Sequence, residues 1–323
     1  MKKNISPFLI VFTLFAASCN TDTDDKQNAI SEQASDDEVS LIVLGTVQDA
    51  GSPQLGCQKE CCANLYAHTD ANRMVSSLGL IDTKNKKTYL FDATPDIAAQ
   101  MDILTSQIDE GKKIVDGIFL THAHIGHYTG LMYLGKESKD ADSTPLYVMP
   151  RMRNFLNTNG PWDQLISRGN VKLKALQHQY PVKISDNITV TPLLVPHRDE
   201  YSETVGYRIT GPNKRALFIP DIDKWEKWEH DIITEINQID YAFIDATFYS
   251  GEEMNNRDIR QIPHPFVIES LAKFQNLTPA EKKKIIFIHF NHTNPLLNPN
   301  SKECKKVLAA GYRIADVKDV FKL

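Results

Sequence analysis

Short hydrophobic runs rich in β-branched residues alternate with longer, more polar segments along most of the chain. Such runs are typical of buried β-strands, and the segments between them are long enough for helices. The hydrophobic runs predict strands at residues 40–45, 77–82, 88–92, 117–121, 145–149, 188–195, 205–210, 216–220, 241–245 and 285–289. The intervening segments predict helices at residues 96–107, 151–157, 225–236, 265–274 and 302–310.

Strands interleaved with helices in this way predict an α/β (α+β) fold of two packed sheets with helices outside. No change in composition marks a further boundary after residue 40, so residues 41–323 are expected to form one domain. Nearly every predicted strand ends beside a polar residue. Candidate functional side chains are therefore expected on the loops along one edge of the sheets.

The N-terminus differs from the rest of the chain. Lys2 and Lys3 precede an apolar segment, residues 8–17, that is too short to span a bilayer as a permanent helix. Small residues then lead into Cys19, so residues 1–19 resemble the signal peptide of a bacterial lipoprotein, in which Cys19 is lipidated after cleavage. An ordinary signal peptide, with Cys19 incidental or removed, is the alternative.

Residues 20–40 are polar and acidic, and they lack the apolar mass that would offset the entropy of ordering. They predict a flexible acidic tether between a lipid anchor at the membrane and the domain. We therefore expect an exported protein, lipid-anchored to a bacterial membrane and facing the periplasm or the exterior. The sequence does not distinguish the inner from the outer membrane.

Composition narrows the partners without naming a function. The 323 residues are 41% hydrophobic and 24% charged, which is ordinary for a globular protein. A net charge of −5 and a pI near 6.1 provide no broad basic field, so nucleic acid is not expected as a stable partner. A small-molecule substrate is expected instead, and the oligomeric state is left open.

Three imidazoles lie within six residues directly after the predicted strand at 117–121. They are His122, His124 and His127. Neutral imidazole is the commonest protein ligand for zinc and similar ions, and a strand that ends in a short loop can direct alternate side chains at one point. This run therefore predicts a metal site.

Single polar residues also stand at the ends of four other predicted strands: Asp92, His197, Asp221 and His289. A side chain at the end of a strand is positioned by the sheet and faces the loops, which is how a rigid scaffold presents reactive groups. Each could be a turn residue when taken alone. Together with the histidine run they predict one functional site.

The order HxHxxH, then His, Asp and His, resembles the metallo-β-lactamase superfamily of hydrolases, whose fold is an αββα four-layer sandwich. The resemblance covers essentially all of the chain after the tether. Residues 195–207, 262–265 and 289–295 are further similar to the coenzyme PQQ synthesis protein B (PqqB) family.

Carried over by motif, the resemblance implies two neighbouring metal positions. His122, His124 and His197 would hold one metal, and His127 and His289 would belong to the second, with Asp221 between them. Asp92 would orient ligands from behind, and the residues expected to take part in catalysis are Asp221, His289 and His264. Zn²⁺ is expected at one or both positions, with Fe²⁺ or Mn²⁺ as alternatives.

Gly126 departs from the motif of the superfamily, which usually has Asp in HxHxDH. The second metal is therefore expected to lack an anionic ligand at this place, and its occupancy is left open. His127, His289 and Asp221 still form a set of two histidines and one carboxylate, which suits zinc and also ferrous iron.

Cys57, Cys61 and Cys62 lie within six residues of one another, in a segment with little apolar content. A disulfide is one interpretation for an exported protein, but three clustered cysteines leave an odd thiol and a bridge between adjacent cysteines is strained. The other is a structural zinc site. In the resembling families a cysteine cluster shares zinc with a histidine three positions after the last catalytic one, which here is His292.

Arg198 and Tyr201 follow the predicted ligand His197, and His264 lies between two prolines in a predicted loop. Arg198 and Tyr201 are expected to contact substrate, and His264 is expected to donate a proton. A loop salt bridge or a surface position is the alternative for each.

The resemblance favours a metal-dependent hydrolase, in which metal-bound hydroxide attacks an ester, lactone, amide or phosphodiester. A PqqB-like iron-dependent oxygenase in PQQ biosynthesis is an alternative, although export would separate it from a cytoplasmic intermediate. A noncatalytic binding lipoprotein, in which Gly126 has disabled the chemistry, is a third. The substrate is not fixed by the sequence.

Overall fold

The computed structural model describes residues 38–109, 111–254 and 258–323. The predicted signal peptide, with Cys19, and almost all of the predicted tether lie outside the described residues. The first strand, β1, begins at Val39, two residues before the expected start of the domain. The described residues fall in one compact unit.

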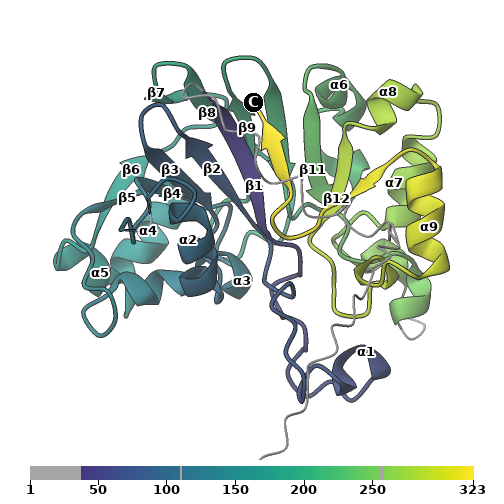
Figure 1. Cartoon of the computed structure of the whole chain (residues 1–323), viewed down its shortest axis with the longest axis horizontal. Coiled ribbons are helices and arrows are strands. Elements are labelled where there is room, and N and C mark those ends of the chain that lie inside the picture. The colour runs from purple at the N-terminus through teal and green to yellow at the C-terminus, as the bar shows by residue number, and fades with distance from the viewer. Residues whose placement is uncertain (1–37, 110, 255–257) are drawn as a thin grey trace, which may run out of the picture. The chain divides into compact units, whose positions relative to one another are not determined.

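Two seven-stranded sheets form the centre of this unit (Figure 1). The first has the order β14-β1-β2-β3-β4-β5-β6, with β14 Val320–Lys322, β1 Val39–Gly45, β2 Ser77–Asp82, β3 Lys87–Phe91, β4 Gly117–Phe119, β5 Thr144–Val148 and β6 Val171–Ala175. The second has the order β13-β12-β11-β10-β9-β8-β7, with β13 Arg313–Ile314, β12 Ile285–Ile288, β11 Tyr241–Asp245, β10 Arg215–Ile219, β9 Val205–Thr210, β8 Ile188–Leu194 and β7 Val182–Ser185.

Each sheet is half antiparallel and half parallel. In the first sheet, the pairs from β14 to β3 are antiparallel and those from β3 to β6 are parallel. The second sheet repeats this arrangement, with antiparallel pairs from β7 to β10 and parallel pairs from β10 to β13. Parallel strands need crossover connections, which explains why the helices follow the parallel halves.

Helices connect the strands and cover the outer faces of the sheets. Their bounds are α1 Glu60–Ala63, α2 Ile97–Thr105, α3 Ile125–Tyr128, α4 Pro150–Thr158, α5 Trp162–Ser167, α6 Ile232–Asn237, α7 Val267–Lys273, α8 Pro279–Lys282 and α9 Lys302–Ala309. Short 3-10 helices occur at Thr129–Leu134, Trp225–Lys227, Gly251–Met254, Ile259–Gln261 and Pro295–Leu297. In Figure 1, α2, α4 and α5 lie beside the first sheet, and α6, α7, α8 and α9 lie beside the second.

An aromatic core joins the two sheets. Phe91 of β3 lies edge-on to Phe218 of β10, with ring centroids 6.3 Å apart, and both side chains are fully buried. Phe119 of β4 lies edge-on to Tyr207 of β9 at 5.6 Å. Each sheet also has one apolar cluster on its outer face, where helices pack against it. The predicted αββα four-layer sandwich is confirmed.

Some predicted elements differ from the structure. The helix expected at residues 225–236 is a 3-10 turn, Trp225–Lys227, followed by a separate helix, α6. The break occurs because the Asp231 side chain accepts hydrogen bonds from the backbone N–H groups of Ile233 and Thr234, which starts a new helix there. The strands β6, β7, β13 and β14 were not predicted.

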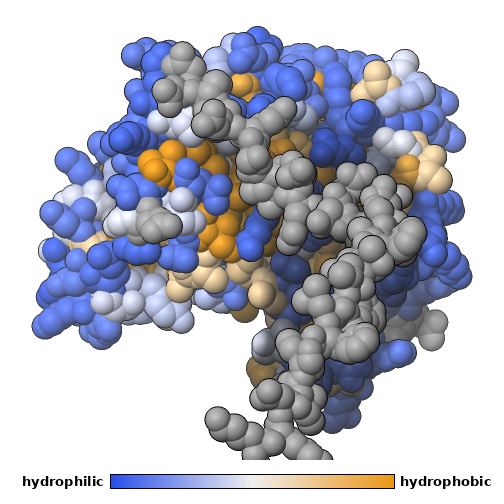
Figure 2. Space-filling view, in the orientation of Figure 1, coloured by the Kyte–Doolittle hydropathy of each residue, from blue (hydrophilic) through white to orange (hydrophobic). Residues whose placement is uncertain are grey.

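Most of the surface in Figure 2 is hydrophilic, and apolar residues gather on the left of that view, on the side of the first sheet. Within residues 38–109, 111–254 and 258–323, no helix combines the length and the apolar character needed to cross a membrane.

Candidate metal centre

The predicted ligands follow strands that end at the same edge of the two sheets. Parallel strands bring their carboxyl ends to one side, where ligand sites of α/β folds form. The residues that follow these strands are Asp92 after β3, His122 after β4, His197 after β8, Asp221 after β10 and His289 after β12.

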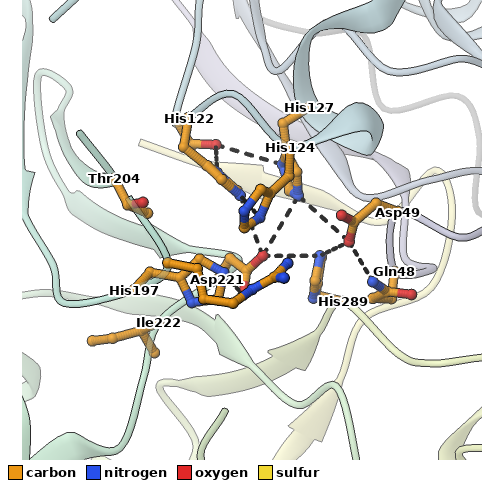
Figure 3. A network of polar contacts seen from close by, with 12 residues as sticks. Gln48, Asp49, His122, His124, His127, His197, Thr204, Asp221, Ile222 and His289 are labelled. Carbon is orange, nitrogen blue, oxygen red and sulfur yellow. Dashed lines mark hydrogen bonds and ion pairs between the residues drawn. The ribbon is translucent and has the colours of Figure 1, made fainter. Parts of the chain in front are cut away.

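The first group of side chains contains His122, His124, His197 and Asp221, whose ligand atoms all lie within 4.8 Å of one another. His122 Nε2 is 2.8 Å from His124 Nδ1 and 3.4 Å from Asp221 Oδ2. His197 Nε2 is 3.3 Å from Asp221 Oδ1. Figure 3 shows Asp221 at the centre of the imidazoles.

The second group contains Asp49, His127, Asp221 and His289, again with all ligand atoms within 4.8 Å. Asp221 Oδ2 is 3.8 Å from His127 Nε2 and 3.9 Å from His289 Nε2. Asp221 therefore belongs to both groups, as expected of a carboxylate between two cations. The structure brings together all six residues that the sequence predicted as metal ligands.

Hydrogen bonds from behind orient the histidines. Asp92 accepts hydrogen bonds from the backbone N–H and the hydroxyl of Thr121, and its Oδ2 is 2.8 Å from His127 Nδ1. Thr121 Oγ1 is 2.9 Å from His122 Nδ1. These contacts fix one nitrogen of each ring and leave Nε2 for a ligand, which is the usual support of metal-binding histidines.

Two residues of the site have left-handed backbone conformations, which are uncommon outside glycine. They are Asp92, with φ of 70°, and His289, with φ of 69°, and each directly follows a strand. Such conformations persist where the surrounding structure holds them, and they cluster at functional sites. Here they turn the side chains away from the strands and toward the loop edge.

The buried nitrogens of the site fit a metal ion. His127 Nε2, His197 Nε2 and His289 Nε2 are buried and make no hydrogen bond within the protein. Leaving a polar atom buried without a partner is costly, so three such atoms around one carboxylate fit a site that binds a ligand. Imidazole nitrogens together with carboxylate oxygens form the donor set that zinc, iron and manganese accept.

Burial and neighbouring charges shift the pKa values of the site residues. Burial alone would raise the pKa of Asp221, but His197, His264 and His289 hold it well below its usual range. Burial lowers the pKa of His122 well below its ordinary value, which keeps this imidazole neutral and available as a ligand.

Comparison with known proteins agrees with this geometry. Residues 87–290 match the model of the Beta-lactamase superfamily domain, which covers more than half of the chain. The chain belongs to the metallo-β-lactamase superfamily. Coenzyme PQQ synthesis protein B of Nitrosococcus oceani is 25% identical over 306 residues, which cover 85% of this chain and 97% of that protein. The protein of the same name from Gluconobacter oxydans is 23% identical over 319 residues, covering 88% and 99%.

Solved structures show the same fold. Zn²⁺-bound PqqB from Methylobacterium extorquens has a TM-score of 0.71 and 23% identity, and the match covers 88% of this chain and 100% of that one. A diphosphatase of the PhnP family has a TM-score of 0.63 and 22% identity, covering 88% and 97%. The predicted place in the metallo-β-lactamase superfamily, close to PqqB, is confirmed.

The structure corrects the expectation about the second position. With Gly126 in the superfamily motif, we expected the second position to lack the carboxylate that the motif usually supplies and to keep only that of Asp221. The structure places the Asp49 carboxylate in the second group, with Oδ1 3.5 Å from His289 Nε2 and 3.9 Å from His127 Nε2. Burial alone would raise the pKa of Asp49, but the adjacent His289 and His127 lower it below the ordinary value, so this carboxylate is charged.

His264 lies beside Asp221 and Asp245. Its Nδ1 is 2.9 Å from Asp245 Oδ2 and 3.1 Å from Asp221 Oδ1. Burial lowers the pKa of His264, but the two carboxylates outweigh burial and raise it to about 10. A histidine that keeps its proton beside a metal site of this superfamily can act as a proton donor.

Arg198 and Tyr201 lie on the exposed rim of the site. The Arg198 guanidinium is 3.7 Å from Glu200, whose other carboxylate oxygen is 3.1 Å from His124 Nε2. Tyr201 is 64% exposed, and its ring lies 5.4 Å from that of Phe155. The contact through Glu200 places Arg198 beside the ligand His124. The expected contact of Arg198 and Tyr201 with substrate stays a prediction.

A separate group of ligands contains Cys57, Cys61, Cys62 and His292, within 4.8 Å of one another. The disulfide interpretation has no support, because all three thiols are free and Cys61 Sγ is 3.9 Å from Cys62 Sγ. Burial and the neighbouring Cys62 raise the pKa of Cys61 to about 12. A cation that binds these sulfurs must therefore displace protons. Three thiolates and one imidazole make a closed tetrahedral set typical of structural zinc.

The sequence alone did not indicate several polar residues of the site. Asp245 ends β11 and accepts hydrogen bonds from the backbone N–H and the hydroxyl of Thr247. Thr247 Oγ1 is 2.9 Å from His289 Nδ1 and so orients this ligand. Asp245 ends a predicted strand and could have been found by the rule that found Asp221. Asp49 had no such signal, because it lies in a loop.

Proposed function

We propose that this protein is a metal-dependent hydrolase that acts on an ester, lactone, amide or phosphodiester of a small molecule. The observation that carries the proposal is the convergence of His122, His124 and His197 on Asp221. Three imidazoles hold a cation, and the fourth protein ligand, Asp221, is shared with the neighbouring position. The site is therefore not closed by four ligands of its own, as a structural zinc site is.

The residues of the chain divide the work of hydrolysis. His122, His124, His197 and Asp221 would hold one ion, and His127, His289 and Asp221 would hold a second. A bound ion supplies Lewis acidity, which activates water at neutral pH and polarises the substrate oxygen. His264 keeps a proton through Asp245 and Asp221, and it is the residue proposed to protonate the leaving group.

The test is turnover of a panel of chromogenic model substrates: bis(p-nitrophenyl) phosphate, p-nitrophenyl acetate and a chromogenic β-lactam. For any substrate that is hydrolysed, His122→Ala is expected to lower kcat by at least about 100-fold, because the substitution removes a ligand of the ion. His178→Ala, at a histidine outside the metal groups, is the matched control and should keep its activity. Unchanged turnover in folded His122→Ala would remove the metal from the mechanism.

An iron-dependent oxygenase is the second candidate, because the curated relatives are coenzyme PQQ synthesis proteins. A set of two histidines and carboxylates at the second position also suits ferrous iron. Iron in the purified full-length protein, with oxygen uptake, would favour this candidate. Zinc alone with no oxygen uptake would exclude it.

A noncatalytic binding role has lost its main argument. That role was based on Gly126, which removes the carboxylate of the family motif, but Asp49 brings a carboxylate to the same group. We further propose structural zinc at Cys57, Cys61, Cys62 and His292, and export with a lipid on Cys19. The small residues before Cys19 support this location.

A further inference from the structure

Asp49 occupies the space that a side chain at position 126 would fill. A Cβ atom placed on Gly126 would lie 2.1 Å from Asp49 Cβ and 2.3 Å from Asp49 Cα. Real Cβ atoms do not approach other atoms so closely, and the obstacle includes backbone that cannot rotate away. The absence of a side chain at Gly126 is therefore what allows Asp49 to reach this place.

The Asp49 carboxylate points at the two histidines of the second group (Figure 3). Its Oδ1 faces both His289 Nε2 and His127 Nε2, and these two nitrogens are buried and make no hydrogen bond. Gln48 Nε2 donates a hydrogen bond of 2.5 Å to the same oxygen, which fixes its direction. Two unpartnered imidazole nitrogens and an oriented carboxylate thus surround one point.

The backbone on the N-terminal side of Asp49 is tied to the strand that carries His289. The Gln48 N–H donates to the Phe290 carbonyl at 2.8 Å, and the Phe290 N–H donates to the Thr46 carbonyl at 2.7 Å. Phe290 directly follows His289, so Asp49 and this histidine are held in register by main-chain hydrogen bonds. A rigid support of this kind is what a ligand position needs.

We propose that Asp49 is a ligand of the second metal ion, in the role that an aspartate at position 126 has in the family motif, and that Gly126 is required to admit it. The ligand has moved from position 126, which lies within the motif in α3, to the loop that follows β1. The second position then has two imidazoles and two carboxylates, with Asp221 shared, and its two negative charges offset those of a divalent cation.

Metal stoichiometry tests the proposal without reference to activity. Full-length protein is dialysed against buffers of fixed free Zn²⁺ concentration, and bound zinc is counted per chain by elemental analysis. The wild-type protein is expected to bind three ions, one at the cysteines and two at the centre. Asp49→Asn keeps the shape of the side chain but removes its charge. It is expected to lower the affinity for one of the three ions by about 100-fold or more.

Gly126→Ala is the decisive variant, because it changes no ligand. The added methyl group must push the loop at Asp49 away, so this variant is expected to lower the affinity for the same ion and for no other. Asp102→Asn on α2 is the control for charge. Gly160→Ala, whose added Cβ would lie in ordinary contact with Asp163 Oδ1 at 3.7 Å, is the control for the methyl group. Both controls should bind three ions.

Circular dichroism of each variant confirms that it is folded. The proposal is overturned if Asp49→Asn keeps the wild-type number of ions at unchanged affinity, if folded Gly126→Ala does so, or if Cys62→Ser, which lacks the cysteine site, binds only one ion at saturating zinc. The inference deepens the proposed function, yet the two fail separately. Three ions without hydrolysis of any substrate would support the role of Asp49 and contradict the hydrolase.

Discussion

His127 connects metal binding to protonation. Its Nδ1 is 2.8 Å from Asp92 Oδ2, while its Nε2 faces the second metal position. Burial lowers the pKa of His127, but Asp92, Asp49 and Asp221 outweigh burial and raise it to about 9. Below that pH the imidazole carries a proton that a metal ion must displace, because only neutral imidazole binds metal.

We therefore expect zinc binding to the metal-free protein to release protons at pH 7. The apparent affinity of the second ion should rise with pH by up to about tenfold per unit for this proton, and this contribution should level off above pH 9. Calorimetry in buffers of different ionisation enthalpy measures the number of protons released. Asp92→Asn removes the partner that raises the pKa, so this variant should release fewer protons; an equal number would contradict the assignment.

At the scale of single residues, the sequence predicted the ligands at strand ends and in the histidine run, and it missed Asp49, which lies four residues after β1 and belongs to neither pattern. His122, His197 and His289 could be found because a strand end fixes where a side chain points. Asp49 could not, because its position depends on a contact with Gly126 across the fold. Nothing in the local sequence around either residue reveals that contact.

At the scale of elements, the alternation of hydrophobic and polar segments located ten of the fourteen strands that the structure describes and missed β6, β7, β13 and β14. The strands β13 and β14 have only two and three residues, too few for a period to show. The helix expected at residues 225–236 has apolar spacing throughout, and only the capping side chain of Asp231 shows where it breaks. Short elements and helix boundaries therefore depend on tertiary contacts that a periodic pattern does not contain.

The segment between β1 and β2 carries three cysteines that are proposed to bind structural zinc together with His292. Cys62→Ser is expected to lower the zinc content by one ion per chain and to lower the melting temperature, since this metal ties the loop to the last strands. Cys304 in α9 is also buried and free but lies outside the group, so Cys304→Ser is the matched control. An unchanged zinc content in Cys62→Ser would exclude the structural site.

At the scale of the whole molecule, the interleaving of strands and helices predicted two packed sheets with helices outside, and the family resemblance predicted the αββα order of the layers. Both sheets have an antiparallel and a parallel half, and hydrophobic runs in the sequence mark most of their strands. The order of strands in each sheet was not predictable from these runs. It depends on crossovers whose direction only the packing of helices on the sheets decides.

The location of the molecule is a prediction that the sequence alone supports. If Cys19 is lipidated, Cys19→Ala should move the protein from the membrane fraction to the soluble fraction or leave it unprocessed. Ser18→Ala replaces one small residue with another before the same cysteine and should stay in the membrane fraction. Mass spectrometry of the N-terminal peptide measures the lipid directly, and an unmodified Cys19 in the mature protein would contradict the anchor.

The segment after β1 is proposed to bind metal at two sites, because Asp49 and the cysteine cluster lie on the same stretch of chain. An oxidant that joins two of the three thiols in a disulfide would release their ion and loosen the loop that carries Asp49. An oxidising compartment would thereby lower the number of metal ions bound at the histidine centre. If the two sites are linked, mild oxidation should lower the number of ions bound at the centre, and a reductant together with zinc should restore it.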